Sequence, residues 1–97
     1  MISAATLLET AMVLEGRLGP DAVADLDLFV LRAGIEIVPF DGDQYTVARS
    51  AFRRFGKGRH AAGLNFGDCI AYALSRITGE PLLFKGTDFA STDVAGC

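Results

Sequence analysis

Three acidic side chains stand at positions from which they could hold a metal ion. Glu9 lies in the first turn of the first predicted helix, Asp68 in the first turn of a later helix, and Asp88 directly after a short apolar strand. In an open α/β sheet, helices begin and parallel strands end at the same edge, so the three carboxylates can face one crevice. Carboxylate oxygens without histidine or thiolate favour Mg²⁺ or Mn²⁺ over zinc. Such a metal can activate water and stabilise an in-line displacement at a phosphodiester.

Each of these acids also has a purely structural interpretation. Glu9 could complete a capping box with Thr6, and Asp68 could serve only the helix N-terminus beside an Asn65 cap. Asp88 could be an ordinary turn residue. Spacing leaves both interpretations open for each acid, and only the three together favour a metal site.

Four further residues could support such a site. Lys57, Arg59 and His60 lie on a glycine-rich loop, residues 56–63, which is the most basic stretch of the chain. They could contact RNA phosphates next to an acidic metal site, or they could belong to a solvated loop. Asp93 could be a fourth metal ligand or a turn residue, and its spacing does not decide between the two.

The remaining charged and aromatic side chains of this region are interpreted as structural. Three arginines fall largely opposite the apolar stripe of one predicted helix, which favours a solvated face over an RNA track: Arg49, Arg53 and Arg54. Three phenylalanines are expected in the core rather than as platforms for stacked bases: Phe52, Phe55 and Phe66. Cys69 lies within an apolar helical pattern and is expected to be a buried thiol rather than a nucleophile.

The composition disfavours several other classes of protein. The 97 residues are 51% hydrophobic and 22% charged, as in one globular domain spanning residues 1–97. The net charge of −3 gives no global basic field, so RNA binding would need a local patch or a metal. A single histidine and two cysteines without metal-like spacing disfavour a structural zinc site and a Ser-His-Asp triad. No apolar run could span a bilayer and no secretory signal opens the chain, so we expect no membrane contact and a cytoplasmic location.

The first predicted helix has two possible starts. Thr6 and Glu9 have the spacing of a capping box, and Ser3 is the alternative cap. Gly16 and Gly19 are expected to end this helix.

Two more helices follow from proline, aspartate and glycine signals. Pro20 is typical of a first helical turn and Gly34 of a helix end, so a second helix is expected between them. Asp41 or Asp43 is expected to cap a third helix. The predicted apolar stripe of that third helix consists of Tyr45, Ala48, Phe52 and Phe55.

A fourth helix and two strands complete the prediction. The fourth helix is capped by Asn65 and stopped by Gly79. The strands are Ile35–Phe40, with Pro39 near its end, and Leu82–Phe84. The predicted buried face of the fourth helix consists of Ile70, Ala73, Leu74 and Ile77.

The order of these elements predicts an α/β fold. Helix, helix, strand, helix, helix, strand is the rhythm of a layered fold with a parallel sheet. Four amphipathic helices are too many for two strands, because a parallel sheet buried on both faces normally has more. We therefore expect a segment that should precede Ser3 to be absent.

Four stretches of the chain resemble the PIN-domain ribonucleases of the VapC toxin type. Ile-Ser-Ala-Ala-Thr-Leu-Leu-Glu at 2–9 resembles the family's second strand and following helix. Leu-Asn-Phe-Gly-Asp-Cys-Ile-Ala-Tyr-Ala at 64–73 is similar to its most recognisable stretch. Leu-Leu-Phe-Lys-Gly-Thr-Asp-Phe at 82–89 and Thr-Asp-Val at 92–94 resemble the next strand and acidic turns. The resemblance runs in order over essentially the whole chain.

This resemblance implies a PIN-like three-layer fold with a short parallel sheet flanked by helices. It implies a metal-dependent endoribonuclease, the toxin of a toxin–antitoxin pair, which usually dimerises and is neutralised by a cognate antitoxin. Glu9, Asp68 and Asp88 would hold Mg²⁺ or Mn²⁺, with Asp93 as a further candidate, and Thr87 would orient a ligand or a water.

The resemblance also implies a departure at the front of the chain. Family members open with a central strand that ends in an aspartate, and this chain has no such segment, so an N-terminally truncated single domain is expected. The alternative hypothesis is therefore a catalytically impaired PIN fragment that acts only in antitoxin binding or self-association.

Overall fold

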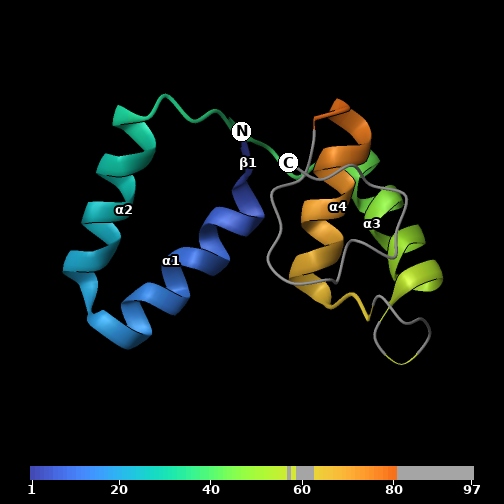
Figure 1. Cartoon of the computed structure of the whole chain (residues 1–97), viewed down its shortest axis with the longest axis horizontal. Helices are drawn as coiled ribbons and strands as arrows, with labels where there is room; N and C mark the ends of the chain where they lie inside the picture. The colour runs from blue at the N-terminus through green and yellow to red at the C-terminus, as the bar shows by residue number, and fades with distance from the viewer. Residues whose placement is uncertain (57, 59–62, 81–97) are drawn as a thin grey trace. The chain divides into compact units, whose positions relative to one another are not determined.

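The computed structural model describes residues 1–56, 58 and 63–80 of the chain. Six elements follow one another in the order β1, α1, α2, β2, α3, α4 (Figure 1). The chain forms two compact units, residues 1–39 and 40–97. The predicted strand Leu82–Phe84 lies outside the described residues.

The first unit contains a two-stranded parallel sheet. β1 (Ile2–Ser3) pairs with β2 (Ile37–Val38) in the register Ile2 to Ile37 and Ser3 to Val38. Parallel strands require a long crossover connection, and here the two helices α1 and α2 supply it. The predicted α/β class with a parallel sheet is thereby confirmed.

Helix α1 (Ala4–Leu18) begins one turn earlier than the capping-box spacing predicts. The chain leaves β1 at Ser3, whose extended backbone lets its Oγ accept a hydrogen bond from the Ala5 N–H at 3.3 Å. The predicted Thr6–Glu9 capping box is therefore wrong, and the alternative cap Ser3 is confirmed. Glu9 is the sixth residue of the helix and lies in its second turn, not in its first.

A glycine separates α1 from α2 (Pro20–Arg32). Gly19 has a φ of 89°, a region that favours glycine, and its N–H donates to the Glu15 carbonyl at 2.9 Å. Pro20 and the acidic Asp21 open α2, as predicted. The strand that follows is shorter than predicted, because β1 offers only two residues for pairing.

The second unit is built on a pair of helices, α3 (Gly42–Phe55) and α4 (Phe66–Thr78), which lie side by side (Figure 1). Asp41 is the N-cap of α3, and its Oδ1 accepts from the Gln44 N–H at 3.0 Å. Gly79 ends α4 in the left-handed conformation, with a φ of 75°. The predicted Asp41 cap of α3 and the predicted stop of α4 at Gly79 are confirmed.

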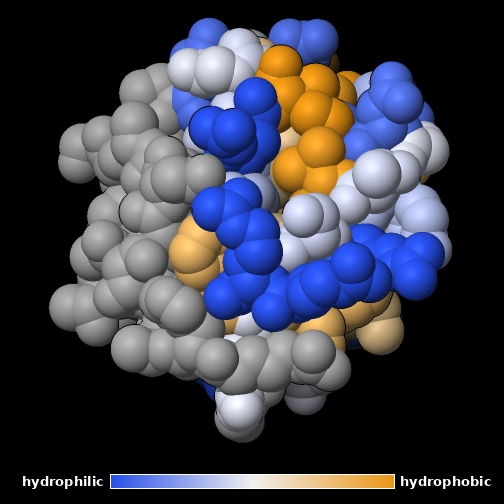
Figure 2. Space-filling model, turned by 90° about the vertical axis from the view of Figure 1, so that its right-hand side faces the viewer, coloured by the Kyte–Doolittle hydropathy of each residue, from blue (hydrophilic) through white to orange (hydrophobic). Residues whose placement is uncertain are grey.

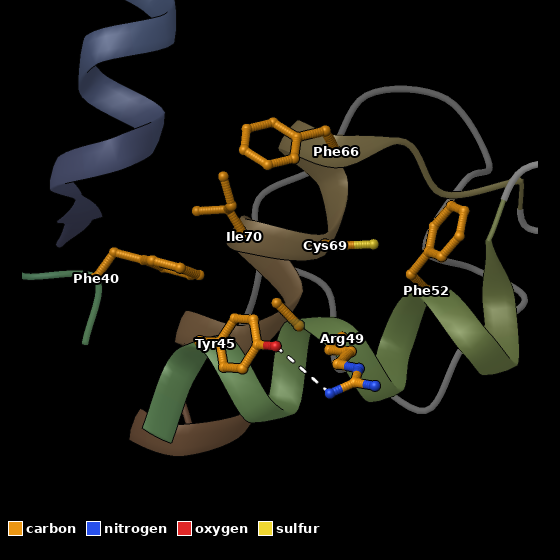
Figure 3. A pocket seen from close by; sticks show the side chains of 8 residues that line it. Phe40, Tyr45, Arg49, Phe52, Phe66, Cys69 and Ile70 are labelled. Atoms are coloured by element: carbon orange, nitrogen blue, oxygen red, sulfur yellow. Dashed lines mark hydrogen bonds between the residues drawn. The ribbon is translucent and has the colours of Figure 1, made fainter. Parts of the chain in front are cut away.

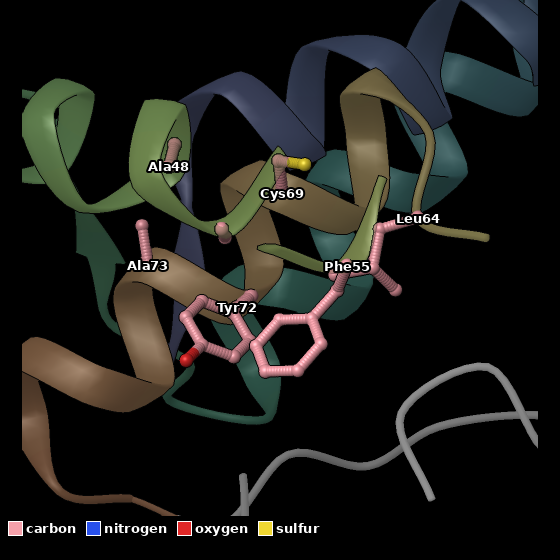
Figure 4. Packing of buried hydrophobic residues seen from close by; sticks show 7 residues of the cluster. Ala48, Phe55, Leu64, Cys69, Tyr72 and Ala73 are labelled. Atoms are coloured by element: carbon pink, nitrogen blue, oxygen red, sulfur yellow. The ribbon is translucent and has the colours of Figure 1, made fainter. Parts of the chain in front are cut away.

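The core of the second unit lies between these helices. The rings of Phe55 and Tyr72 meet with centroids 5.8 Å apart and planes inclined at 50° (Figure 4). Leu64 joins them, because its N–H donates to the Phe55 carbonyl at 2.8 Å and its side chain is fully buried. Small side chains allow the helices to approach closely. The buried cluster consists of Ala48, Ala51, Phe55, Leu64, Cys69, Tyr72 and Ala73.

The apolar stripe predicted for α3 is only partly correct. Ala48 and Phe55 are buried as predicted, but Tyr45 is 53% exposed and Phe52 41% exposed. Gln44 and Ala51, each of which directly precedes one of these exposed residues, are buried instead. The face that packs on α4 is thus rotated, because a close helix contact selects the small Ala51 over the bulky ring of its neighbour.

On α4, three of the four predicted core positions are confirmed. Ile70, Ala73 and Leu74 are buried, whereas Ile77 is exposed. Phe66, the first residue of the helix, is 80% exposed and is not a core residue. Of the three phenylalanines expected in the core, only Phe55 is buried there.

Across the described ranges, no helix combines the length and apolar character needed to cross a membrane.

Candidate functional site

Asp68 occupies the third position of α4 and takes part in a capping box. The Asn65 Oδ1 accepts from the Asp68 N–H at 2.9 Å. In return, the Asp68 Oδ2 accepts from the Asn65 N–H at 3.0 Å. The structure therefore confirms that Asp68 serves the helix N-terminus beside the Asn65 cap.

This capping role leaves the second carboxylate oxygen of Asp68 available. Within residues 1–56, 58 and 63–80, its Oδ1 accepts no hydrogen bond, and the side chain is only half-buried. A carboxylate that is fixed through one oxygen and open at the other is a donor of the type that Mg²⁺ or Mn²⁺ accepts. The residue fits a metal site, and capping does not compete with that use.

Glu9 is exposed on α1 in the first unit. Asp68 belongs to the second unit. In the part of the chain that the structure describes, no three His, Cys, Asp or Glu side chains gather as a metal site. The other predicted metal ligands, Asp88 and Asp93, lie outside the described residues.

The predicted phosphate-binding loop also falls largely outside the described residues. Lys57, Arg59 and His60 all belong to the segments that are not described, as does Thr87. Their predicted contacts with RNA remain predictions.

Thr6 is a residue whose environment the sequence did not indicate. Its Oγ1 is buried and, among the described residues, has no hydrogen-bond partner. A buried hydroxyl without a partner costs about 1–3 kcal/mol of folding free energy, and this is the cost expected for the Thr6 hydroxyl. Thr6 and Glu9 are three residues apart on α1 and thus lie on the same side of this helix.

Cys69 follows Asp68 directly and is buried in the core of the second unit. Burial raises the pKa of its thiol, and the neighbouring negative charge of Asp68 raises this pKa further. A thiol that keeps its proton is a poor nucleophile. The predicted assignment of Cys69 to the core is confirmed.

These elements and this acidic position agree with a known family. The pattern of the PIN domain matches residues 1–95. The chain belongs to the PIN domain family. The matched range contains all four predicted metal ligands, including the two beyond the described residues.

Curated relatives assign this PIN domain to the VapC type. It is 54% identical over 94 residues to the Ribonuclease VapC of Mycolicibacterium smegmatis, covering 97% of this chain and 73% of that protein. It is 52% identical over 95 residues to Ribonuclease VapC30 of Mycobacterium tuberculosis, covering 98% and 72%. Ribonuclease VapC36 of the same species is 39% identical over 94 residues, covering 97% and 68%.

Proposed function

We propose that this PIN domain is an endoribonuclease toxin that cleaves RNA phosphodiester bonds with Mg²⁺ or Mn²⁺. The observation that carries the proposal is the geometry of Asp68, which caps α4 through Oδ2 while its Oδ1 accepts no hydrogen bond from the described residues. The names of the relatives, all ribonucleases of the VapC type, supply the substrate class.

The proposed metal ligands are Asp68, Glu9 and Asp88, with Asp93 as a further candidate. When bound, the metal would lower the pKa of a water molecule and offset the charge that develops on the phosphate. The chain itself contributes a preorganised carboxylate, because the capping box holds the Asp68 side chain in one orientation. The proposed setting is the cytoplasm, with a cognate antitoxin and a second copy of the chain as partners.

The test is RNA cleavage by the full chain and by Asp68→Asn. The amide oxygen that this substitution introduces can still accept from the Asn65 N–H, so the helix cap survives while the charge is lost. Cleavage of a broad RNA panel should require Mg²⁺ or Mn²⁺ and stop in EDTA. It should fall by about a hundredfold or more in Asp68→Asn, because even the loss of a residue that only orients a metal ligand costs about 10–100-fold.

Asp43→Asn is the matched control, because Asp43 also lies in the first turn of a helix and is exposed. It loses the same charge at the same kind of position and should cleave at the rate of the unmodified chain. Equal activity of Asp68→Asn and Asp43→Asn would refute the proposed role of Asp68.

A second candidate function is protein binding without catalysis. The helices of the first unit expose many large apolar side chains, which is typical of surfaces that bind other proteins. They include Leu8, Met12, Leu18, Phe29 and Leu31. This candidate predicts self-association or antitoxin binding by a chain that never cleaves RNA, and sedimentation velocity beside the cleavage assay separates the two functions.

A further inference from the structure

One residue supplies both hydrogen bonds that hold Asp68 at the start of α4. Among residues 1–56, 58 and 63–80, the only hydrogen bond to the Asp68 carboxylate comes from the Asn65 backbone N–H, at 3.0 Å to Oδ2. The Asp68 backbone N–H donates in turn to the Oδ1 of the Asn65 side chain, at 2.9 Å. Asn65 therefore holds Asp68 at two points, one on its backbone and one on its carboxylate.

Two buried neighbours anchor this pair of hydrogen bonds. Leu64 directly precedes Asn65 and is fully buried, and its N–H donates to the Phe55 carbonyl at 2.8 Å. Cys69 directly follows Asp68 and is also buried, and its N–H donates to the Asn65 carbonyl at 3.0 Å. Figure 3 shows the Cys69 side chain on the side of α4 that faces α3. The backbone of the capping box is thus fixed by the core, although the Asn65 side chain itself is exposed.

The Asp68 carboxylate lies in a part of the chain that offers it other partners. Residues 44–67 hold five of the nine lysines and arginines and none of the twelve acidic residues. Figure 2 views the side on which α3 and α4 are drawn in Figure 1, and it shows hydrophilic side chains crossing this face beside an apolar patch. A carboxylate near solvent and cations changes rotamer readily unless hydrogen bonds restrain it, and this restraint costs conformational entropy. In the folded chain, the capping box supplies that restraint before any ligand binds.

We propose that Asn65 is the positioning residue of the metal site, because it holds the Asp68 carboxylate by Oδ2 and thereby presents Oδ1 to the metal. Asn65 does not contact the metal itself. This inference rests on the proposed metal-dependent function and adds the residue that sets the metal affinity of Asp68. Residues that orient a metal ligand through hydrogen bonds typically contribute about 10–100-fold to metal affinity. The sequence pattern had predicted Asn65 only as a helix cap.

The test measures Mn²⁺ binding in the absence of RNA. The full chain is titrated with MnCl₂, and electron paramagnetic resonance follows the free Mn²⁺. Asn65→Ala removes the acceptor of the Asp68 N–H and so loosens the turn that carries the carboxylate. It should raise the Kd for Mn²⁺ about tenfold, the lower end of the expected range, because the backbone N–H of residue 65 remains. Asn65→Ser should restore the Kd of the unmodified chain, since its hydroxyl can accept the same hydrogen bond.

Asp41→Ala is the matched control, because it removes a helix cap of the same kind from α3. The Asp41 Oδ1 accepts from the Gln44 N–H at 3.0 Å, so this variant loses a hydrogen bond like the one that Asn65→Ala loses. It should lower the urea midpoint by a similar amount and leave the Kd for Mn²⁺ unchanged. A loss of metal affinity through general destabilisation would appear in both variants, so their comparison separates positioning from stability. Circular dichroism establishes that each variant is folded under the conditions of the titration.

The Kd values of the variants decide the role of Asn65. A Kd that rises in Asn65→Ala, returns in Asn65→Ser and stays constant in Asp41→Ala supports the positioning role. An unchanged Kd in Asn65→Ala, an equal rise in Asp41→Ala, or no recovery in Asn65→Ser overturns it.

Asp68→Asn, titrated in parallel, tells a failure of this role from a failure of the proposed function. If Asp68→Asn binds Mn²⁺ much more weakly than the unmodified chain while Asn65→Ala binds it normally, the metal site stands and only the positioning role fails. If the unmodified chain binds no Mn²⁺, or Asp68→Asn binds it equally well, the proposed role of Asp68 fails and the positioning role fails with it.

Discussion

The capping box at the start of α4 predicts how much of the local stability one side chain provides. Asn65→Ala removes the acceptor of the Asp68 N–H, a hydrogen bond of 2.9 Å. The Asn65 backbone N–H keeps its bond to the Asp68 Oδ2, so the substitution leaves only one donor without a partner. Loss of an N-cap costs about 0.5–2 kcal/mol, and because Asn65 is exposed we expect about 1 kcal/mol.

The assay is thermal and urea unfolding followed by circular dichroism. For a chain of this size, about 1 kcal/mol corresponds to a decrease in Tm of about 4–8 °C. Asn65→Ser should lose at most a few tenths of that free energy, because its hydroxyl can accept the same bond.

A double-mutant cycle with Asp68→Ala then tests whether the two bonds act together. Both N–H groups lose their partners in the double variant, and we expect a coupling of about 0.5 kcal/mol or more between the two sites. Equal stability of Asn65→Ala and Asn65→Ser would refute this reasoning, because it would mean that the cap contributes nothing.

Three further predictions follow from buried groups. A Cβ at Gly56 would collide with the carbonyl oxygen and ring of Phe52, so Gly56→Ala should destabilise the chain by about 1–3 kcal/mol in urea unfolding. The open position Gly42 is its control, and Gly42→Ala should be neutral or slightly stabilising. Thr6→Val keeps the shape of the side chain and removes the unpartnered hydroxyl, so its urea midpoint should be equal or higher, and a clear loss would reveal a partner for that hydroxyl. Because the pKa of the Cys69 thiol is raised in the folded chain, this thiol ionises first in the unfolded chain as the pH rises. The stability that the protonated thiol contributes is therefore present below about pH 8.5 and is lost as pH rises through the folded pKa. Cys69→Ala should therefore lose less stability between about pH 7 and pH 9.5 than the unmodified chain, and an identical pH profile would contradict this.

Local chemistry explains why the ends of α4 could be predicted from the sequence. Asn65, Asp68 and Gly79 act within a few residues of themselves, through a side-chain cap and a left-handed glycine. Such signals depend little on the rest of the fold. The candidate metal ligand Asp68 was found for the same reason, because a helix start can be recognised without knowing its surroundings.

Tertiary packing explains what the sequence could not predict. The spacing of Thr6 and Glu9 matches a capping box, yet Ser3 caps α1 because the chain turns out of a strand there. On α3, the pattern of large apolar residues pointed to Tyr45 and Phe52, whereas the close approach of α4 buried Ala51. Alanine carries little weight in a hydrophobic pattern, so the true contact face was hidden.

Ser3 has two duties at once, since it pairs with Val38 as the last residue of β1 and caps α1 with its side chain. No spacer separates the sheet from the helix, so the rotational phase of α1 is set by the register of the strand. One residue inserted between Ser3 and Ala4 would turn every side chain of α1, Glu9 included, by about 100° around the helix axis. Length variation among related chains should therefore avoid this junction and collect instead at places such as the Gly19 bend, where two helices meet without sharing a strand.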